Sequence, residues 1–250
     1  MKILKISMFA IGTSICGLAQ ADVIGVKADA SYWFYDGKAQ VQPHNTTSLS
    51  NQTGVDNLLL DPYADSREYD LDRKGSAQIS LAIEHPIPLI PNAKIRYVNL
   101  KSQTEKELAG QPVYDLNIDH TDFILYYEIL DTIVNADVGL GATNLNGDIK
   151  TLNVRKTDID KTVPVIYGSA GVKLPFTGLS AKAELLYSNI NDTKITDAQA
   201  ELQYNFIDNL LVDVGLKAGY RILDVKLDDY DKNDVKFNFK GPYIGLDMHF

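Results

Sequence analysis

The chain has 250 residues and a formal net charge of −9 at pH 7, and hydrophobic residues make up 45% of it. This acidic balance argues against nucleic acid as a partner, because binding to phosphates depends on an excess of lysine and arginine. After residue 21, no stretch approaches 18 consecutive apolar residues, so the sequence predicts no membrane-spanning helix there.

Residues 1–21 have the pattern of a cleaved secretory signal peptide. A short basic start precedes an apolar stretch at 6–18, and Ala19-Gln20-Ala21 fits a cleavage site. The apolar stretch is shorter than the ~20 residues of a spanning helix. Cleavage removes two lysines and no acids, so the charge falls from −9 to −11. A lipid anchor on Cys16 is an alternative, but Ile15 stands where a small residue is preferred.

From residue 22 onward, the dominant pattern is an alternation of apolar and polar residues. Ala77, Ile79 and Leu81 share one face of a predicted strand, and Ser76, Gln78 and Ser80 share the other. We predict ten such strands, at 22–36, 73–85, 92–102, 114–130, 133–146, 162–174, 178–190, 194–206, 209–226 and 234–250. Many exceed the ~9–11 residues that a transmembrane strand needs. Eight or twelve strands remain possible, because 191–193 could be a continuous bend and the first loop could hide a hairpin.

The predicted connections alternate in length. Those after even-numbered strands are short: 86–91, 131–132, 175–177 and 207–208. Those after odd-numbered strands are longer and more polar, with the exception of the fourth: 37–72, 103–113, 147–161, 191–193 and 227–233. This asymmetry is typical of outer-membrane barrels, which have tight periplasmic turns and longer extracellular loops. The sequence therefore predicts an all-β fold, a single closed antiparallel transmembrane β-barrel over 22–250 with a long extracellular loop at 37–72.

The stretch EHPIPLIPN, residues 84–92, marks the first periplasmic turn. Pro86, Pro88 and Pro91 cannot donate to a sheet ladder, so they end the second strand and stiffen the turn. Leu89 and Ile90 stay apolar because such a turn can touch the bilayer interface. The alternative is an apolar loop in a soluble periplasmic β-sandwich binding protein.

In a membrane barrel the apolar faces contact lipid and the polar faces line the lumen. The polar faces here carry charges of both signs, which would meet inside a ten-stranded barrel. We expect a lumen charge network that holds the barrel shut or sets its ion preference, made by Lys94, Arg96, Glu184, Asp213, Lys217, Arg221 and Asp247. Mixed signs favour a plugged or narrow lumen over a wide pore, since a generous channel needs ~16 strands.

The last eight residues, YIGLDMHF, look like the C-terminal signal of outer-membrane barrels. Gly245 is followed by hydrophobic residues two apart, Met248 and Phe250, and such a strand can be captured by edge pairing. Phe237 and Phe239 have the wrong parity for the lipid face. A β-bulge at Gly241-Pro242 would explain this shift.

EHPIPLIPN, the first strand VIGVKADASYWFYD and the terminal phenylalanine together resemble a family of small proteobacterial outer-membrane β-barrel proteins of unassigned function. The resemblance covers the whole mature chain. It implies the barrel fold and an outer-membrane location, and it supplies no catalytic residues.

Asp119, His120 and Asp122 suggest the alternative of an outer-membrane enzyme, either a protease or a lipid-modifying enzyme. The omptin proteases are ten-stranded barrels whose acidic and histidine residues at the outer rim activate water. The present cluster lacks a second acid–base pair across the rim, so we expect a structural, narrow-pore or ligand-binding barrel and no enzyme.

The acidic stretch 228–234 partly resembles a calcium loop, with Asp229, Asp231 and Asn233 as candidate ligands. The glycine and the glutamate of such loops are missing, since Asp234 and Lys240 stand there. We therefore expect no metal and no cofactor. The expected partners are outer-membrane lipid and lipopolysaccharide, with the barrel-assembly machinery and periplasmic chaperones during biogenesis, and the barrel is expected to be a monomer.

Overall fold

The computed structural model describes residues 25–43, 67–87, 89–108, 110–152, 155–209, 212–230 and 233–250. The predicted signal peptide, Pro88, Asp231 and the central part of the predicted loop 37–72 lie outside the described residues. Among the residues described, no helix is long and apolar enough to cross a membrane.

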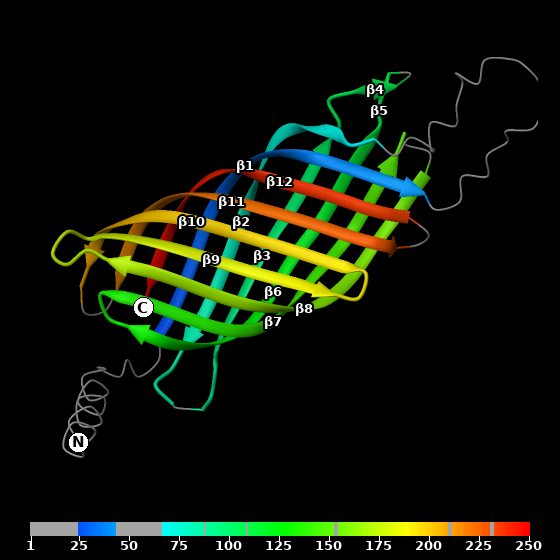
Figure 1. Cartoon of the computed structure of the whole chain (residues 1–250). Coiled ribbons are helices and arrows are strands. Elements are labelled where there is room, and N and C mark those ends of the chain that lie inside the picture. The colour runs from blue at the N-terminus through cyan, green and yellow to red at the C-terminus, as the bar shows by residue number, and fades with distance from the viewer. Residues whose placement is uncertain are drawn as a thin grey trace, which may run out of the picture.

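Ten long strands form a closed antiparallel barrel (Figure 1). They are β1 (Gly25–Pro43), β2 (Tyr69–Glu84), β3 (Asn92–Gln103), β6 (Tyr114–Asp131), β7 (Val134–Thr151), β8 (Arg155–Lys173), β9 (Leu179–Ile190), β10 (Thr193–Asp208), β11 (Asp213–Tyr230) and β12 (Asn233–His249). A small hairpin of β4 (Glu107–Leu108) and β5 (Gln111–Pro112) lies in the predicted loop 103–113. The predicted all-β barrel is confirmed. The β-sandwich alternative is wrong, because the sheet closes on itself.

The barrel closes at a seam between its first and last strands. β1 pairs with β12 from Lys27↔His249 to Pro43↔Asn233. Val26 and Phe250 add two backbone hydrogen bonds of 3.0 and 2.9 Å beyond the ladder. Gly25 and Phe250 therefore lie at one end of the barrel, which we call the proximal end, and the opposite end is the distal end (Figure 1).

The strands run further toward the distal end than the alternation predicted. Within the predicted loop 147–161, β7 extends to Thr151 and β8 begins at Arg155, and the two strands pair from Gly147↔Ile159 to Thr151↔Arg155. β1 likewise continues to Pro43, β2 begins at Tyr69, and β11 and β12 reach into 227–233. These loop boundaries were wrong. The prediction of a tight link at 191–193 fits the structure, where Ile190 pairs with Thr193 across a turn.

Strand β11 shows why the distal segments resemble loops in sequence. Its buried, inward-facing residues change from charged to apolar toward the distal end, in the order Lys217, Arg221, Leu223, Val225 and Leu227. Its outward-facing residues change in the opposite sense, in the order Leu216, Tyr220, Ile222, Asp224 and Lys226. We call the part with polar interior and apolar exterior the proximal half, and the part with apolar interior and polar exterior the distal half.

The same exchange accounts for the two phenylalanines of β12. Phe237 and Phe239 are buried and point into the barrel. The pairing of β12 with β11 continues without a shift from Asp213↔His249 to Leu227↔Val235. The predicted bulge at Gly241-Pro242 is therefore wrong: the parity is kept, and it is the polarity of each face that changes.

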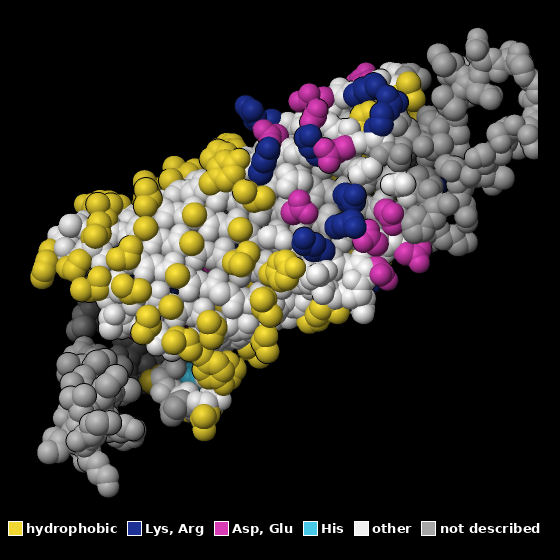
Figure 2. Space-filling model, viewed as in Figure 1, with side chains coloured by type: hydrophobic (Ala, Val, Ile, Leu, Met, Phe, Trp, Pro, Cys, Tyr) yellow, Lys and Arg dark blue, Asp and Glu magenta, His cyan; other side chains and the backbone are white. Residues whose placement is uncertain are grey.

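The exterior divides in the same way. Figure 2 shows hydrophobic side chains gathered over the proximal half and lysine, arginine, aspartate and glutamate gathered over the distal half. Large apolar side chains exposed on the proximal wall include Leu81, Leu125, Leu140, Leu202, Leu216 and Leu246. The outer wall of the proximal half is thus an apolar band around the barrel.

The interior of the distal half is a hydrophobic core. Its members include Trp33, Tyr35, Leu71, Leu100, Leu116, Ile118, Leu145, Ile149, Ile159, Leu223, Val225, Phe237 and Phe239. Trp33 lies at the boundary of the two halves, where its indole nitrogen donates to the Gly241 carbonyl at 3.1 Å. Its ring also lies 4.7 Å from the Arg221 guanidinium, a cation–π contact.

Candidate functional site

Arg96 on β3 reaches across the lumen of the proximal half. Its Nε donates to Asp122 Oδ2 at 2.9 Å, its Nη1 to Glu184 Oε1 at 3.1 Å, and its Nη2 to Asp197 Oδ2 at 2.6 Å. β3 and β10, which carries Asp197, lie five strands apart in the ten-stranded order and face each other across the barrel. The planar fork of a guanidinium suits such multiple contacts with carboxylates.

Arg221 on β11 approaches Asp197 from the other side. Its Nε and Nη2 donate to the two oxygens of Asp197 at 2.9 and 2.7 Å. Its Nη1 donates to the side-chain oxygen of Gln78, and its Nη2 lies 3.2 Å from Nδ1 of His120. Asp197 is therefore shared between two arginines, and the pairs merge into one network.

Lys94 and Lys217 extend the network along the lumen toward the proximal end. Lys94 Nζ lies 2.6 Å from Glu184 Oε2, which also accepts a hydrogen bond from the Tyr167 hydroxyl at 3.2 Å. Lys217 contacts Asp29 and lies 3.2 Å from Glu201. We use the name central charge network for Arg96, Arg221, Lys94, Asp122, Asp197 and Glu184.

The central charge network is balanced, with three cations and three carboxylates. All six residues lie inside the barrel, and the Arg221 side chain has no exposed surface. A buried charge is costly unless it is paired and hydrogen-bonded. Lys182 adds a fourth cation 3.6 Å from Glu184, so each carboxylate of the central charge network lies close to at least one cation.

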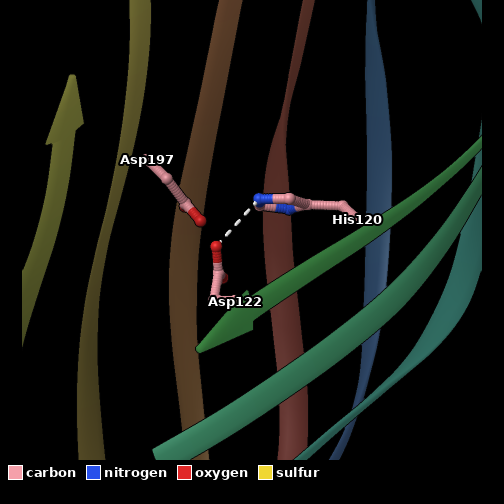
Figure 3. A group of neighbouring side chains, drawn as sticks. All are labelled: His120, Asp122 and Asp197. Carbon is pink, nitrogen blue, oxygen red and sulfur yellow. Dashed lines mark ion pairs between the residues drawn. The ribbon is translucent and has the colours of Figure 1, made fainter. Parts of the chain in front are cut away.

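His120, Asp122 and Asp197 point toward one another, as Figure 3 shows, and their ligand atoms lie within 4.8 Å. His120 Nε2 is 3.2 Å from Asp122 Oδ1. That oxygen also accepts from Thr143 at 2.6 Å, and the other Asp122 oxygen accepts from Arg96. Because the carboxylates already receive two guanidinium groups, the donor set fits arginine and does not fit a metal ion.

The three residues of the alternative enzyme hypothesis, Asp119, His120 and Asp122, do not converge at the rim. His120 and Asp122 are buried inside the barrel. Asp119 points outward, where it accepts hydrogen bonds from the Tyr97 hydroxyl at 2.6 Å and from Asn99 at 2.8 Å. Successive residues of a strand face opposite sides of a sheet, so three neighbours cannot converge on one substrate.

The predicted lumen residues divide into two groups. Lys94, Arg96, Glu184 and Arg221 meet in the central charge network, and Lys217 pairs beside it. Asp213 and Asp247 lie nearer the proximal opening. Asp213 Oδ2 is 4.0 Å from His249, and Asp247 accepts from Gln203 at 3.4 Å.

The sequence prediction missed Asp197 and Gln78 among the residues that line the lumen, whereas Asp122 was expected on a polar, inward face. Asp197 has the same parity as Gln199 and Glu201 within the predicted strand 194–206, so its inward direction was readable from the alternation. Its ion-pair partners could not be predicted from the sequence, because they depend on how the barrel closes.

A water-accessible vestibule of about 540 Å³ opens at the proximal end. Its charged wall comprises Lys27, Glu128, Asp131, Asp137, Lys173, Lys182, Glu201, Asp213 and Asp247. Deeper in the lumen, a space of only about 70 Å³ is lined by residues that include Lys94, Arg96 and Glu184. The lumen therefore narrows from the vestibule into the central charge network.

The remaining predicted site residues lie at the two ends of the barrel. Gly245 faces inward beside Ser31, and Phe250 is exposed on the outer wall, on the same face as Met248. Asn233 is buried and accepts a hydrogen bond from Arg155 at 3.2 Å, and the backbone N–H of Asp229 donates to Asp234. The buried position of Asn233 does not suit a calcium ligand at a loop tip.

No protein-family model and no curated protein sequence matches the chain. Among solved structures, the outer membrane protease OmpT from Escherichia coli is similar with a TM-score of 0.50 and 10% identity, covering 94% of this chain and 99% of OmpT. The chain has the fold of an outer-membrane β-barrel. The translocator domain of the autotransporter NalP from Neisseria meningitidis gives a TM-score of 0.40 and 10% identity, covering 98% and 95% of the two chains.

Proposed function

We propose that the chain is an integral β-barrel of the bacterial outer membrane with a closed lumen, exported by its signal peptide. The proximal half spans the membrane with its open end toward the periplasm, and the distal half stands outside as a water-facing barrel. The observation that carries this proposal is the exchange of polarity on both faces of the same strands at one level of the barrel.

The dimensions support this placement. The proximal parts of β11 and β12, residues 213–222 and 241–249, agree with the roughly 9–11 residues that a tilted transmembrane strand needs. Aromatic side chains are exposed at both edges of the apolar band, with Tyr32 and Phe34 at the distal edge and Tyr204 and Phe206 at the proximal edge. Aromatic rings prefer the two membrane–water interfaces.

The proposed role is structural and surface-presenting, without conduction and without catalysis. The central charge network crosses the lumen at the inner end of the vestibule, and the hydrophobic core fills the distal half behind it. The strand ends and loops of the distal half would then meet lipopolysaccharide and the exterior. We also propose that the barrel is a monomer and that the assembly machinery binds its last strand.

Membrane insertion is tested by expressing the full chain with its own signal and separating the cell envelope. We expect the protein in the outer-membrane fraction, with a gel mobility in detergent that changes on heating, as expected of a stable closed barrel. Recovery of the mature protein as a detergent-free monomer in buffer would contradict the membrane assignment.

Closure of the lumen is tested in planar lipid bilayers. We expect the reconstituted protein to give no steady single-channel conductance, because two layers of side chains block the path. A reproducible open level would show that the lumen conducts. A peptide-cleavage assay on the same preparation tests the proposal that there is no protease activity.

A further inference from the structure

A depression in the apolar band crosses β2, β3, β6 and β7 and has a volume of about 500 Å³. Its outward-facing lining residues are Leu81, Ile83, Ala93, Ile95, Phe123, Leu125, Leu140 and Ala142. Lys94, Ile124 and Gly141 also line it, and the side chains of Lys94 and Ile124 point into the barrel. Ala93 pairs with Ile83 on one side and with Leu125 on the other, so a small side chain stands between two larger ones. Ala142 stands beside Phe123 in the same way. We call this depression the wall groove.

The proline turn between β2 and β3 connects the strand ends that carry Ile83 and Ala93, two residues of the wall groove. Tyr127 follows Leu125 in the outward-facing series of β6, and its hydroxyl donates to the backbone carbonyl of Leu89 at 2.9 Å. This bond holds the turn against the outer wall of the barrel, on the proximal side of the wall groove. The turn consequently lies beside the lipid-facing surface and away from the vestibule axis.

The proline turn presents apolar side chains at an unfavourable position. Leu89 is 90% exposed, and its backbone has φ 74°, a region that favours glycine or asparagine. Ile87 and Ile90 are exposed as well. Water on all sides gives no reason for a leucine there, whereas an apolar neighbour outside the chain does.

We infer that the wall groove holds an acyl chain of a phospholipid from the periplasmic leaflet, and that the apolar side chains of the proline turn contact this lipid on the proximal side of the groove. This inference rests on the proposed function, because the wall groove must lie within the membrane. Its volume falls in the range of roughly 300–1,000 Å³ typical of small-molecule sites, and the outward-facing side chains that line it are all apolar.

A lipid chain fits the wall groove better than a second copy of the barrel does. Two barrels present convex walls to each other, so a depression between strands of one wall stays unfilled when they meet. The side chains of the wall groove also offer no hydrogen-bonding group to a protein partner. A flexible hydrocarbon chain can follow the small residues Ala93 and Ala142.

The inference is tested by filling the wall groove with Ala93→Phe. The matched control is Ala200→Phe, since Ala200 is exposed on β10, on the opposite side of the barrel. Both variants and the natural protein are purified in a mild detergent, and retained phospholipid is measured by native mass spectrometry. We expect bound phospholipid on the natural protein and on Ala200→Phe, and a several-fold loss on Ala93→Phe.

A second variant, Leu89→Gly, separates ligand binding from a structural role. Glycine adopts a positive φ without strain, so the barrel should not be destabilised. We expect retained phospholipid to fall while the thermal midpoint stays equal or rises. Equal lipid retention in the natural protein, Ala93→Phe and Leu89→Gly would overturn the inference, as would cross-linking through the wall groove to a second copy.

Heat-modifiable mobility, measured on the same samples, keeps the two proposals apart. A natural protein without it would refute the outer-membrane proposal. A heat-modifiable barrel that retains no phospholipid would leave that proposal standing and refute the lipid site alone.

Discussion

The proximal and distal halves of the barrel are built from the same ten strands, yet they follow opposite rules. In the proximal half, leucine and tyrosine face outward and arginine faces inward; in the distal half, the assignments are exchanged. The backbone pairing runs through both halves without a change of parity on β12. An alternating pattern therefore identifies a strand, whereas the surrounding solvent decides which face becomes the interior.

The two interiors are also stabilised differently. The distal core gains free energy by removing apolar surface from water. The proximal lumen contains charges whose desolvation is unfavourable, so its stability depends on each charge having its partner. A substitution is therefore expected to act by a different mechanism in each half.

Arg221→Ala is expected to be the most destabilising single change. It leaves the Asp197 carboxylate with Arg96 as a partner but without Arg221, and loss of one partner of a buried pair costs about 3–5 kcal/mol. Urea unfolding in lipid vesicles, followed by Trp33 fluorescence, measures it. Arg73→Ala, at an exposed distal position, is the control and should stay within about 0.5 kcal/mol. Equal midpoints for the two would show that the network adds no stability.

Leu223→Ala tests the distal core, because Leu223 is the next inward-facing residue after Arg221 on β11. Leu223 is fully buried, and truncating such a leucine costs about 2–5 kcal/mol through lost transfer energy and the cavity left behind. Leu216→Ala, on the outer wall of the proximal half, should cost less because lipid chains fill the vacated space. Unfolding midpoints in the same vesicles decide this, and a larger loss for Leu216→Ala would contradict the assignment of the two halves.

Leu216→Lys and Asp224→Lys place the same charge on the outer wall of β11 in each half. The first is expected to cost about 2–4 kcal/mol, as for lysine near the middle of a bilayer. The second should change the free energy of unfolding by less than about 0.5 kcal/mol, since its position faces water. Similar losses for both would show that the membrane boundary does not lie between them.

The smallest effect is expected at the exposed pair of Lys226 and Asp228, 2.8 Å apart on the distal wall. The hydrogen bond to Asp228 raises the pKa of Lys226 above its usual value. A raised lysine pKa stabilises the fold below about pH 10.4, and this contribution disappears as pH rises through the folded-state pKa. Lys226→Gln should remove only this slight alkaline dependence, which urea midpoints at neutral and alkaline pH would measure.

The sequence predicted the ten strands and the closed barrel because alternation is a local signal. It mispredicted the distal ends of the strands because Lys156, Asp158 and Asp160, which face water, resemble loop residues. The inward residues Ile149 and Ile159 were visible in the sequence, but a pattern of polar residues with occasional apolar ones does not by itself indicate a strand.

The central charge network was predictable only in part. Arg96 and Glu184 were identified from their parity, but the Arg96–Asp197 contact joins residues 101 positions apart. Which residues meet across the lumen depends on the stagger of ten strands, a property of the closed barrel as a whole. No local pattern in the chain contains it.

The seam between β1 and β12 can form only after the last strand of the chain has been synthesised. Trp33, Tyr35, Phe239 and Phe237 form a continuous run of ring contacts across it, with centroid distances of 5.1, 5.2 and 5.9 Å. Because β1 is synthesised long before β12, Trp33 and Tyr35 have no contact with Phe239 and Phe237 until β12 has been made. Contacts between such distant residues form slowly. Pairing of the final strand would thus close the barrel and exclude water from its distal core in a single late step.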